Sequence, residues 1–544
     1  MIILGITHPI SWNNAACILV DGQLVAFAEE ERFNRIKHAP RMPAVEAIHY
    51  CLQTANVTMD DVDYVAIGFD SALRAAMGNI TLREGLSGLN QAAQWLRDGS
   101  TYERLLPLDG VDKEKIVFVN HHLSHAASTF FASGFEEANI LSLDGSGGSE
   151  SGILAVGRGT NIEILRTVTN RGSWGLLYES VTEKLGFRRH SGEGKTMGLA
   201  AFAEPDPEGL PVVDWSGEIP VIDPQKRKNF LADLPTRRPD EELNETHEQL
   251  ASNLQDTLER AGQRMTEWLY EQTGIDSLCL AGGTALNCSM NGKLAQLPWV
   301  KNIFIQPAAH DAGTALGAAL YVYAQKSGRR PNWVMEHAYW GPEYSNEEIE
   351  NALRSFTGIR YQQSDDIFSE AADQLVAGKV VGWFQGRLEV GPRALGNRSI
   401  LGNPSIPEMK DLINKKVKNR EPWRPFAPSV LAESVDRYVD AAMPSPYMIL
   451  AFDTKPETKD EIISATHVDG TCRPQTVRKD TNPRYWQLIK RFEERTGIPA
   501  VLNTSFNVAK QPIVNRPHEA IDTFLNCGMD VLAIGDFIVF KEGA

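Results

Sequence analysis

The sequence predicts an α/β fold of two domains, with a plan that is repeated inside the N-terminal one. Strand-like runs alternate with long amphipathic helical stretches, and several of the runs end at a glycine-rich turn. A length of 544 residues is enough for two to four domains with large cores. The hydrophobic content of 42% and the charged content of 23% are ordinary for a globular protein.

The chain is expected to begin with a strand and a hairpin. IILGI (2–6) is a β run, and ACILV (16–20) and QLVAFA (23–28) flank Asp21-Gly22, which is a strong hairpin signal. The next stretch, MPAVEAIHYCLQTA (42–55), has the pattern of a helix.

The same order recurs further along the chain. ANILSLDGSGG (138–148) predicts a strand that ends in a glycine-rich loop, and SGILAVGRGTNIEIL (151–165) predicts strand, turn and strand. A helical stretch follows at 250–274. This repeated hairpin-then-helix plan resembles the duplicated α/β core of the actin-like (ASKHA) ATPases.

Two strand-to-helix junctions complete the first domain, at 278–286 and at 303–325, where Ala and Gly let helix and sheet approach closely. The polar, proline-bearing stretch 326–340 is a connector, so we expect a boundary near Gly341 and domains at 1–340 and 341–544. A helix (368–378) and a strand (379–384) open the second domain.

Bulk properties exclude several classes of protein. No stretch of 18 uncharged apolar residues occurs, and the N-terminus lacks the pattern of a signal peptide, so we expect a cytoplasmic protein that does not cross a membrane. The formal net charge of −16 opposes nucleic-acid binding. The six cysteines contain no CxxC, which argues against zinc fingers, redox dithiols and a disulfide framework.

The stretch NHHLSHAAS (120–128) contains three histidines within five positions. His121 and His125 are four apart, so that on a helix both lie on one face and can bind one metal ion. Asp144 follows the strand-like run ILSL, and Asp311 lies at a strand-to-helix junction. The ends of such strands meet at one edge of an open sheet. Two imidazoles and two carboxylates suit iron(II), manganese or zinc. Taken singly, Asp144 could cap a turn and Asp311 could cap a helix.

Three glycine-containing stretches are candidates for phosphate or nucleotide contacts. DGSGGSESG (144–152) offers backbone N–H groups beside a carboxylate, and AGGTALN (281–287) opens a helix whose N-terminus favours anions. SGEGKTMG (191–198) is not a P-loop, because Arg189 stands where that motif requires glycine, but Lys195 is retained as a phosphate contact.

The segment from Arg387 to Arg424 is basic, with nine Lys or Arg and four Asp or Glu. Arg393 and Arg424 lie between prolines and glycines, where a rigid backbone fixes a guanidinium for a planar anion. VLNTSFN (501–507) and CRPQTVR (472–478) add hydroxyls, amides and arginines. Together these stretches predict a second pocket for a small phosphate compound and a nucleotide.

These motifs together resemble the O-carbamoyltransferase family, which includes tobramycin, cephalosporin and nodulation-factor carbamoyltransferases. The resemblance covers nearly the whole chain, and its most specific parts are AFAEEERFNRIKHAP, HHLSH, LDGSGG, GKTMGLA, GGTALN, HDAGTALGAA, QGRLEVGPRALGNRSIL, VKNREPWRPFAP and LNTSFN.

The resemblance implies a fold and a reaction. It implies an actin-like N-terminal domain and an α+β, YrdC-like C-terminal domain. Carbamoyl phosphate and ATP would give carbamoyl-adenylate in the second domain, and the first domain would transfer the carbamoyl group to a hydroxyl of a small-molecule natural product, as in antibiotic biosynthesis.

The resemblance also implies the site residues. Iron(II), with another divalent metal as the alternative, would be held by the catalytic set His121, His125, Asp144 and Asp311. Carbamoyl phosphate would contact Lys37, Arg393, Lys418 and Arg424. Nucleotide contacts would involve Arg473, Asn503, Ser505, Gly283 and Asn287.

One stretch departs from the family pattern. Many members have His-Asp-Ala-Ser where this chain has Trp12-Asn13-Asn14-Ala15. A histidine there could help to deprotonate the acceptor hydroxyl, so the general base is left open, and Trp12 could instead stack on a bulkier acceptor. The acceptor itself, whose contacts would lie in loops such as 72–106 and 205–244, and the oligomeric state, for which a homodimer is permitted, also stay open.

Two other functions are compatible with the motifs. A tRNA threonylcarbamoyl-modification enzyme would share the fold, although the acidic composition opposes tRNA binding. A non-catalytic, actin-like nucleotide-binding regulator would not need the pocket around Arg393 and Arg424.

Overall fold

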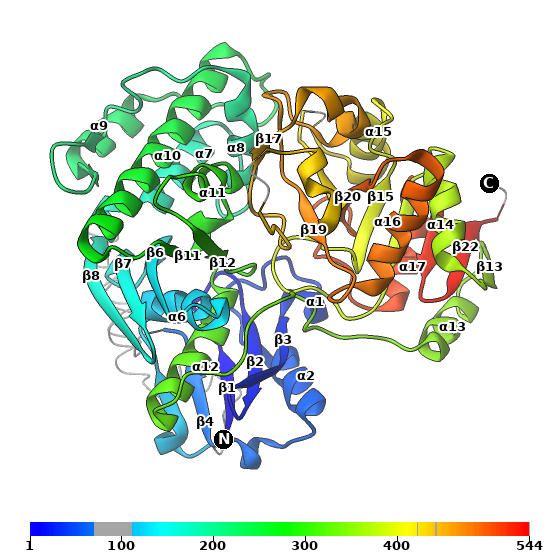
Figure 1. Cartoon of the computed structure of the whole chain (residues 1–544), viewed down its shortest axis with the longest axis horizontal. Helices are drawn as coiled ribbons and strands as arrows, with labels where there is room; N and C mark the ends of the chain where they lie inside the picture. Colours follow the sequence, from blue (N-terminus) through cyan, green and yellow to red (C-terminus); the bar gives the residue numbers. More distant parts are fainter. Residues whose placement is uncertain (70–110, 422, 441–442, 543–544) are drawn as a thin grey trace. The chain divides into compact units, whose positions relative to one another are not determined.

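The computed structural model describes residues 1–69, 111–421, 423–440 and 443–542, and the chain forms two compact units (Figure 1). Unit 1 consists of Met1–Asn34 and His38–Met335, and unit 2 of Arg35–Lys37 and Glu336–Ala544.

The division between the units lies before the boundary expected at Gly341, because the connector is bonded to unit 2. Val390 N donates to Ala338 O at 2.9 Å, and Gly341 N donates to Leu388 O at 2.9 Å. The segment 35–37 also belongs to unit 2, where Arg35 lies 3.1 Å from Glu519. Neither feature follows from the composition of the connector.

Unit 1 contains two five-stranded sheets of the same topology. Their strand orders are β3-β2-β1-β4-β5 and β12-β11-β6-β7-β8. In each sheet the first three strands form an antiparallel meander, and the last two run parallel to the first. The predicted duplication is therefore present. The first sheet consists of β1 (Ile2–Ile6), β2 (Ala15–Val20), β3 (Gln23–Glu29), β4 (Tyr64–Ile67) and β5 (Ile116–Phe118). The second consists of β6 (Glu137–Gly147), β7 (Glu150–Arg158), β8 (Asn161–Thr169), β11 (Ser277–Ala281) and β12 (Asn302–Ile305).

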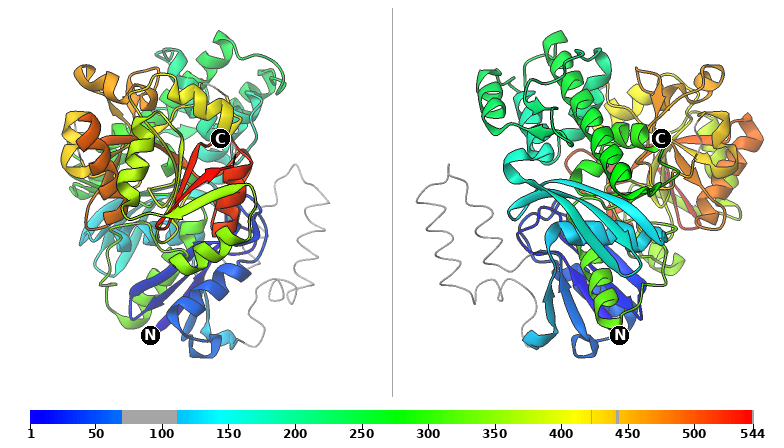
Figure 2. Two further views of the ribbon diagram at one scale, coloured as in Figure 1. Left: turned by 90° about the vertical axis from the view of Figure 1, so that its right-hand side faces the viewer. Right: turned by 60° about the vertical axis from the view of Figure 1, so that its left-hand side comes forward.

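Local sequence explains the first hairpin and one departure from expectation. Asp21 and Gly22 both have positive φ, 49° and 80°, as the tight turn between β2 and β3 requires. The glycine-rich stretch after Leu143 is not a free loop as expected. Strand β6 continues to Gly147, which pairs with Glu150, and the register is irregular between Leu143 and Gly147 (β6 to β8 are seen in the right-hand view of Figure 2).

Two helices cross at the centre of unit 1, α6 (His121–Ser133) and α12 (Ala312–Ser327), and they pack against each other (Figure 1). Helix α6 follows the first sheet but packs on β6 and β11 of the second, whereas α12 follows the second sheet and packs on β1 and β2. A Cβ on Gly317 would lie 1.7 Å from Ser124 O, and one on Gly5 would lie 2.2 Å from Ala315 O. The small residues therefore permit this close packing, as predicted.

Other described helices of unit 1 pack either on the sheets or on one another: α2 packs on β2 and β3, α7 and α10 pack on β6, and α8 and α11 pack on α10. Helix α10 is the longest, with an Asn244 N-cap and a Gly274 C-cap in the left-handed region. Stretch 281–287 forms a short 3₁₀ turn over Gly283–Leu286 before the next helix, rather than opening it directly. These helices are α1 (Glu31–Asn34), α2 (Val45–Ala55), α7 (Trp174–Lys184), α8 (Glu193–Leu199), α9 (Pro224–Asp233), α10 (Glu245–Thr273) and α11 (Cys288–Ala295).

Acceptor contacts were expected in two stretches, 205–244 and 72–106. Stretch 205–244 contains the two-stranded pair β9 (Val213–Asp214) and β10 (Val221–Ile222) and helix α9, so it is not a plain surface loop. Stretch 72–106 lies outside the described residues.

Unit 2 is built on one eight-stranded mixed sheet with the order β13-β22-β21-β14-β15-β20-β16-β19. The strands are β13 (Ile359–Gln363), β14 (Val381–Phe384), β15 (Arg398–Gly402), β16 (Ala427–Leu431), β19 (Gln475–Val477), β20 (Ala500–Ser505), β21 (Val531–Ile534) and β22 (Phe537–Lys541). Strands β13 and β22 pair antiparallel (left-hand view of Figure 2). A separate short pair consists of β17 (Phe452–Asp453) and β18 (Thr471–Cys472).

Each face of this sheet has its own apolar core. One core joins α14 (Ile367–Val376) and α16 (Pro483–Thr496) around Trp383. The other joins α13 (Asn346–Arg354), α15 (Met409–Leu412) and α17 (Pro517–Leu525) around Phe384. Adjacent strand residues thus point to opposite cores, which is the period-2 pattern of a sheet covered on both faces. The helix and strand predicted for 368–384 are confirmed.

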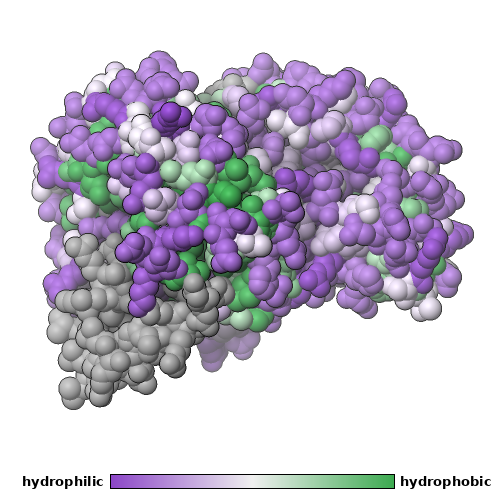
Figure 3. Space-filling view, turned by 90° about the horizontal axis from the view of Figure 1, so that it is seen from below, coloured by the Kyte–Doolittle hydropathy of each residue, from purple (hydrophilic) through white to green (hydrophobic). Residues whose placement is uncertain are grey.

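The surface seen in Figure 3 agrees with the polar composition of the chain. The face shown in Figure 3 is covered mainly by hydrophilic residues, with apolar residues gathered in a few groups. Among the described residues, no helix combines the length and the apolar character that a membrane span requires.

Candidate functional site

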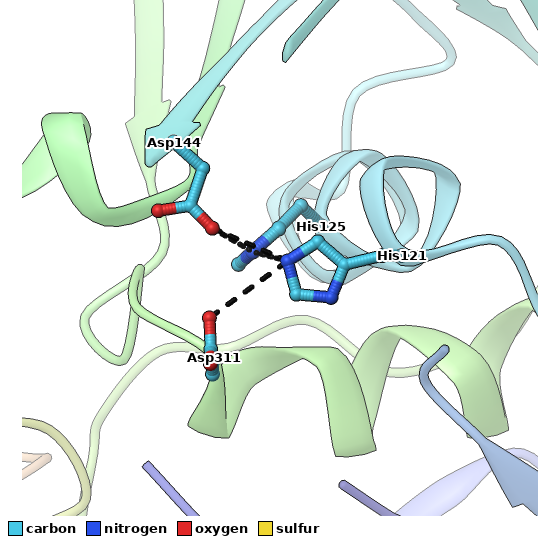
Figure 4. Close-up of side chains that lie close together, drawn as sticks. All are labelled: His121, His125, Asp144 and Asp311. Atoms are coloured by element: carbon cyan, nitrogen blue, oxygen red, sulfur yellow. Dashed lines mark hydrogen bonds and ion pairs between the residues drawn. The ribbon is translucent and has the colours of Figure 1, made fainter. Parts of the chain in front are cut away.

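The metal ligands predicted from the sequence lie on elements around the crossing of α6 and α12 (Figure 4). Two residues separate the end of β5 from the start of α6. The second of them, Asn120, is the N-cap of α6, and its side chain accepts a hydrogen bond from Leu123 N at 3.0 Å. This N-cap fixes the first turn, which holds His121 and His125. Asp144 belongs to β6, and Asp311 immediately precedes α12.

The four side chains converge on one point. Their nearest ligand atoms all lie within 4.8 Å of one another. His121 Nε2 is 3.1 Å from His125 Nε2, 3.2 Å from Asp144 Oδ2 and 3.8 Å from Asp311 Oδ1. Figure 4 shows both aspartates directed at the histidines. His125 Nε2 is 3.4 Å from Asp144 Oδ2.

The structure rejects both of the simpler roles considered for the aspartates. Asp311 makes no side-chain capping bond to α12, and its Oδ2 instead accepts a hydrogen bond from Trp12 N at 2.7 Å. Asp144 Oδ1 accepts from the distant Gly283 N at 3.1 Å rather than from its own glycine turn. In each aspartate one oxygen is anchored by backbone, and the other faces the histidines.

Burial and charge shift the pKa values of His121, His125 and Asp144. Burial raises the pKa of Asp144, but hydrogen bonds from His121 and His125 outweigh burial and hold that pKa well below its usual range. Burial also opposes a proton on His121, and the hydrogen bond to Asp144 and the charge of Asp311 outweigh it, so the pKa of His121 is raised. Burial lowers the pKa of His125.

His122, the third histidine of the motif, is not part of this cluster. It is fully buried, and burial together with the charge of His121 lowers its pKa to about 3. It is therefore a neutral core residue, in agreement with the helical periodicity that directs it away from His121 and His125.

The cluster fits a divalent cation. Ligands at about 2.0–2.2 Å from one ion are themselves about 3–4 Å apart, which is the spacing of these atoms. Two imidazole nitrogens and two carboxylate oxygens suit a borderline metal such as iron(II), manganese or zinc. Each carboxylate is further oriented by a backbone N–H, as is usual around metal ligands.

The residues expected to contact a nucleotide in unit 1 have structural partners. Gly283 N donates to Asp144, so this residue positions a ligand of the metal cluster. Asn287 is the N-cap of α11, accepting from Met290 N at 3.0 Å, and it also bonds Gln255. Lys195 in α8 lies with its Nζ 5.4 Å from the centroid of the Phe187 ring.

In unit 2 the structure gathers several of the predicted cations. Burial, followed by the charges of Arg420 and Arg424 and a smaller contribution from Lys37, holds the pKa of Lys418 well below its usual range. Burial and the charge of Arg473 lower the pKa of Arg424, against the opposing effect of Glu421. We call Lys37, Lys418, Arg420, Arg424 and Arg473 the basic cluster.

Arg420 is the member of the basic cluster that was not predicted. Burial and then Arg424 lower its pKa to about 9. Its Nε donates to Asn414 Oδ1 at 2.6 Å, and its guanidinium lies 4.3 Å from the centroid of the Phe426 ring. The signal in the sequence was its place between Lys418 and Arg424.

Lys418 lies at the end of a π-helical turn, Ile413–Lys418, a distortion that is frequent at functional sites. Its ammonium donates to the backbone and side chain of Asn507, at 3.0 and 2.8 Å, and contacts the Ser505 carbonyl and hydroxyl. Ser505, a predicted nucleotide contact, thus helps to hold Lys418.

The other two predicted residues, Arg393 and Asn503, are associated with one loop of unit 2. Arg393 is in the loop between β14 and β15, next to Ala394. Asn503 in β20 donates to Ala394 O at 3.1 Å and to Ser429 Oγ at 2.9 Å. Asn503 therefore fixes the backbone beside Arg393. Arg473 has a buried Nε that forms no hydrogen bond with the part of the chain that the structure describes.

The chain is similar to known proteins over most of its length. The family model for the carbamoyltransferase N-terminus matches residues 2–320, and that for the carbamoyltransferase C-terminus matches residues 372–541. Nodulation protein NolNO of Sinorhizobium fredii is 39% identical over 99% of this chain and 81% of that protein. An uncharacterized protein of Synechocystis, sll1178, is 37% identical over 97% of this chain and 95% of that protein.

A third relative, nodulation protein NolO of Bradyrhizobium diazoefficiens, is 42% identical over 78% of this chain and 79% of that protein. Both family models match, and the residues that they match include the four of the metal cluster and all five of the basic cluster. The chain therefore belongs to the carbamoyltransferase family.

Proposed function

We propose that the protein is an ATP-dependent O-carbamoyltransferase. In this proposal unit 2 forms carbamoyl-adenylate and pyrophosphate from carbamoyl phosphate and ATP. Unit 1 then transfers the carbamoyl group to a hydroxyl of a small molecule. The observation on which the proposal mainly rests is the convergence of His121, His125, Asp144 and Asp311 within 4.8 Å in a chain of this family.

We assign that cluster to iron(II), with another divalent metal as the alternative. A divalent ion held there would act as a Lewis acid on a carbonyl or phosphate oxygen. The contribution of the chain is to orient the ligands. Trp12 N and Gly283 N each fix one oxygen of an aspartate, so that the other oxygen stays directed at the histidines.

The basic cluster supports the role proposed for unit 2. Carbamoyl phosphate is small and carries two negative charges, which suits a buried set of mutually repelling cations. An anion bound there would relieve the repulsion that depresses these pKa values. We propose that unit 2 is a YrdC-like domain. This proposal is supported by the mixed sheet of unit 2, which is covered by helices on both faces.

Adenylation is proposed because a carbamoyl carbon is a poor electrophile. Its nitrogen donates electron density into the carbonyl group, and a better leaving group offsets that loss of reactivity. The acceptor is proposed to be a small molecule of specialised metabolism. The names of two relatives mention nodulation, which is compatible with such a role. We also propose a cytoplasmic location, where ATP and carbamoyl phosphate are available.

The proposal is tested by incubating the metal-loaded protein with carbamoyl phosphate, ATP and a panel of hydroxyl compounds. The panel contains glycerol, glucose, N-acetylglucosamine and an aminoglycoside. We expect pyrophosphate release that requires carbamoyl phosphate, together with a product heavier than its acceptor by one carbamoyl group. The matched control is Arg424→Ala, which should release no pyrophosphate. Absence of pyrophosphate with the unmodified protein would refute the proposal.

A further inference from the structure

We propose that His190 is the general base that accepts the proton of the acceptor hydroxyl during carbamoyl transfer. This inference rests on the proposed function and adds to it the residue that activates the acceptor. It is drawn from the position of His190 between Trp12 and Glu179, two residues whose own segments are anchored on aspartates of the metal cluster.

The first anchor is Trp12. Its backbone N–H donates to Asp311 Oδ2 at 2.7 Å, so Trp12 directly adjoins the metal cluster. Its ring centroid lies 4.1 Å from that of His190, with the two planes inclined by 34°. A contact this close fixes one face of the imidazole. Trp12 therefore contacts Asp311 through its backbone and His190 through its ring.

The second anchor is Glu179 on helix α7. The Ser173 hydroxyl caps this helix and donates to Gly145 O at 2.7 Å and to Asp144 O at 3.2 Å. Gly175 lies so close to this strand that a Cβ on it would be 2.5 Å from Asp144 O. Helix α7 is thus fixed to β6 at the metal-binding aspartate.

The carboxylate of the buried Glu179 contacts His190 Nδ1 and so orients the imidazole. The remaining charged groups nearby do not displace this contact. Arg189 lies 3.3 Å from the same carboxylate, and Glu193 accepts from the backbone N of His190 at 2.8 Å.

The local backbone is held in an unusual state. His190 has φ of +59°, in the left-handed region that non-glycine residues seldom occupy and that is enriched at functional positions. Its side chain is 43% exposed, and Nε2 forms no hydrogen bond with any residue in the described ranges. The nitrogen opposite the Glu179 contact is thus available to a substrate.

The proposed step forms one bond and breaks one bond at the carbamoyl carbon. The acceptor oxygen forms a bond to the carbamoyl carbon of carbamoyl-adenylate, and its proton passes to His190 Nε2. The bond between that carbon and the phosphate oxygen breaks, and AMP leaves with the electron pair. Glu179 holds the imidazolium until the proton passes to water. The products are the carbamate ester and AMP, and no oxidant or reductant is required.

The experiment compares His190→Ala with the unmodified enzyme in two assays. The first measures pyrophosphate formation from ATP and carbamoyl phosphate, which does not involve His190 and should be unchanged. The second measures carbamoylation of the members of the hydroxyl panel, whose kcat should fall by about 10²–10⁴-fold with little change in acceptor KM. Free imidazole should restore part of the lost rate, since it can occupy the space vacated by the side chain.

Two variants serve as controls. His49→Ala, which removes an exposed histidine from α2, should leave both assays unchanged. In His125→Ala, which lacks a metal ligand, imidazole should not restore carbamoyl transfer. This control distinguishes replacement of a lost base from binding of imidazole at the metal site. Glu179→Gln should show a smaller loss of kcat than His190→Ala, because it removes the partner of the base and keeps the base.

The outcomes separate the two proposals. No pyrophosphate from the unmodified enzyme, or pyrophosphate without transfer to any panel member, counts against the proposed function and therefore against this inference too. Transfer by His190→Ala at the unmodified rate, or a loss that imidazole does not relieve in a variant of unchanged metal content, overturns the role of His190 alone.

Discussion

The backbone N–H of Trp12 donates a hydrogen bond of 2.7 Å to Asp311 Oδ2, although the two residues are 299 positions apart. Because the donor belongs to the main chain, the bond does not depend on the side chain at position 12. A tryptophan side chain at position 12 is therefore not required to orient this aspartate. The tryptophan side chain instead forms part of the surface beside the metal cluster, where its ring contacts the ring of His190.

The metal assignment predicts that His125→Ala loses its bound metal. His125 Nε2 lies 3.4 Å from Asp144 and 3.1 Å from His121, so its removal leaves three ligands of the four. We expect elemental analysis to show less than about a tenth of the unmodified iron content, because loss of even an outer-shell partner of a metal ligand typically costs about 10–100-fold in affinity. The matched control is His122→Ala, which empties an equally buried position in the same helix turn and should keep the metal. Stoichiometric iron in His125→Ala would contradict the ligand set.

The basic cluster predicts that Arg473→Gln weakens binding of phosphate compounds. Arg473 adds positive charge beside Arg424 and has a buried Nε that forms no hydrogen bond with the described residues. Removal of one charge-assisted contact should cost roughly 1.5–3 kcal/mol, or about tenfold or more in affinity. The measurement is the rise in thermal midpoint that carbamoyl phosphate causes. Lys415→Gln, an exposed lysine of the same basic segment, should respond as the unmodified protein does. Equal responses of both variants would exclude Arg473 from the pocket.

Helix packing predicts that Gly317→Ala destabilises unit 1. The added methyl group would lie 1.7 Å from Ser124 O, which is backbone and cannot move aside without shifting α6 and with it His121 and His125. The expected cost is about 1–3 kcal/mol or more, as for other overpacked cores. Thermal unfolding and metal content measure the two consequences. Gly194→Ala is the control, because its Cβ would meet nothing within 4 Å in helix α8, and it should be neutral or slightly stabilising.

A pH dependence of stability is predicted from Glu30. Burial raises the pKa of this carboxyl from 4.5 to about 7, against the opposing hydrogen bond from Ala47 N. The folded state therefore holds the proton more tightly than the unfolded state, so this contribution is complete below pH 4.5 and is lost as the pH rises to about 7. The loss is on the order of 1–3 kcal/mol after allowance for solvent screening.

Glu30→Gln should abolish this contribution and be more stable than the unmodified protein at pH 8. Urea unfolding at pH 5 and pH 8 measures the difference. Glu208→Gln, which changes an exposed carboxylate, should keep the original pH dependence. If Glu30→Gln behaves as Glu208→Gln does, the carboxyl of Glu30 ionises normally in the folded protein.

Patterns among residues that are close together in the sequence predicted a large part of the structure. The Asp21-Gly22 turn, the two repeated meanders and the helices at 42–55 and 250–274 all follow from periods of 2 and 3.6 and from turn chemistry. The four-residue spacing of His121 and His125 predicted two ligands on one helix face, and the structure places them there. Similar reasoning was wrong about the stretch after Leu143, since pairing with β7 extends β6 across a sequence that locally favours a turn.

The sequence by itself determined the two-domain α/β plan, the histidine pair and the basic segment, because each depends on residues close together in the chain. Only the tertiary structure decided what surrounds them. The bonds of Trp12 to Asp311 and of Gly283 to Asp144, and the contact of Trp12 with His190, join residues from 139 to 299 positions apart. These contacts exist because α6 and α12 cross at Gly317 between two sheets. Periodic patterns along the chain predict the single elements, but they do not predict which elements pack against each other.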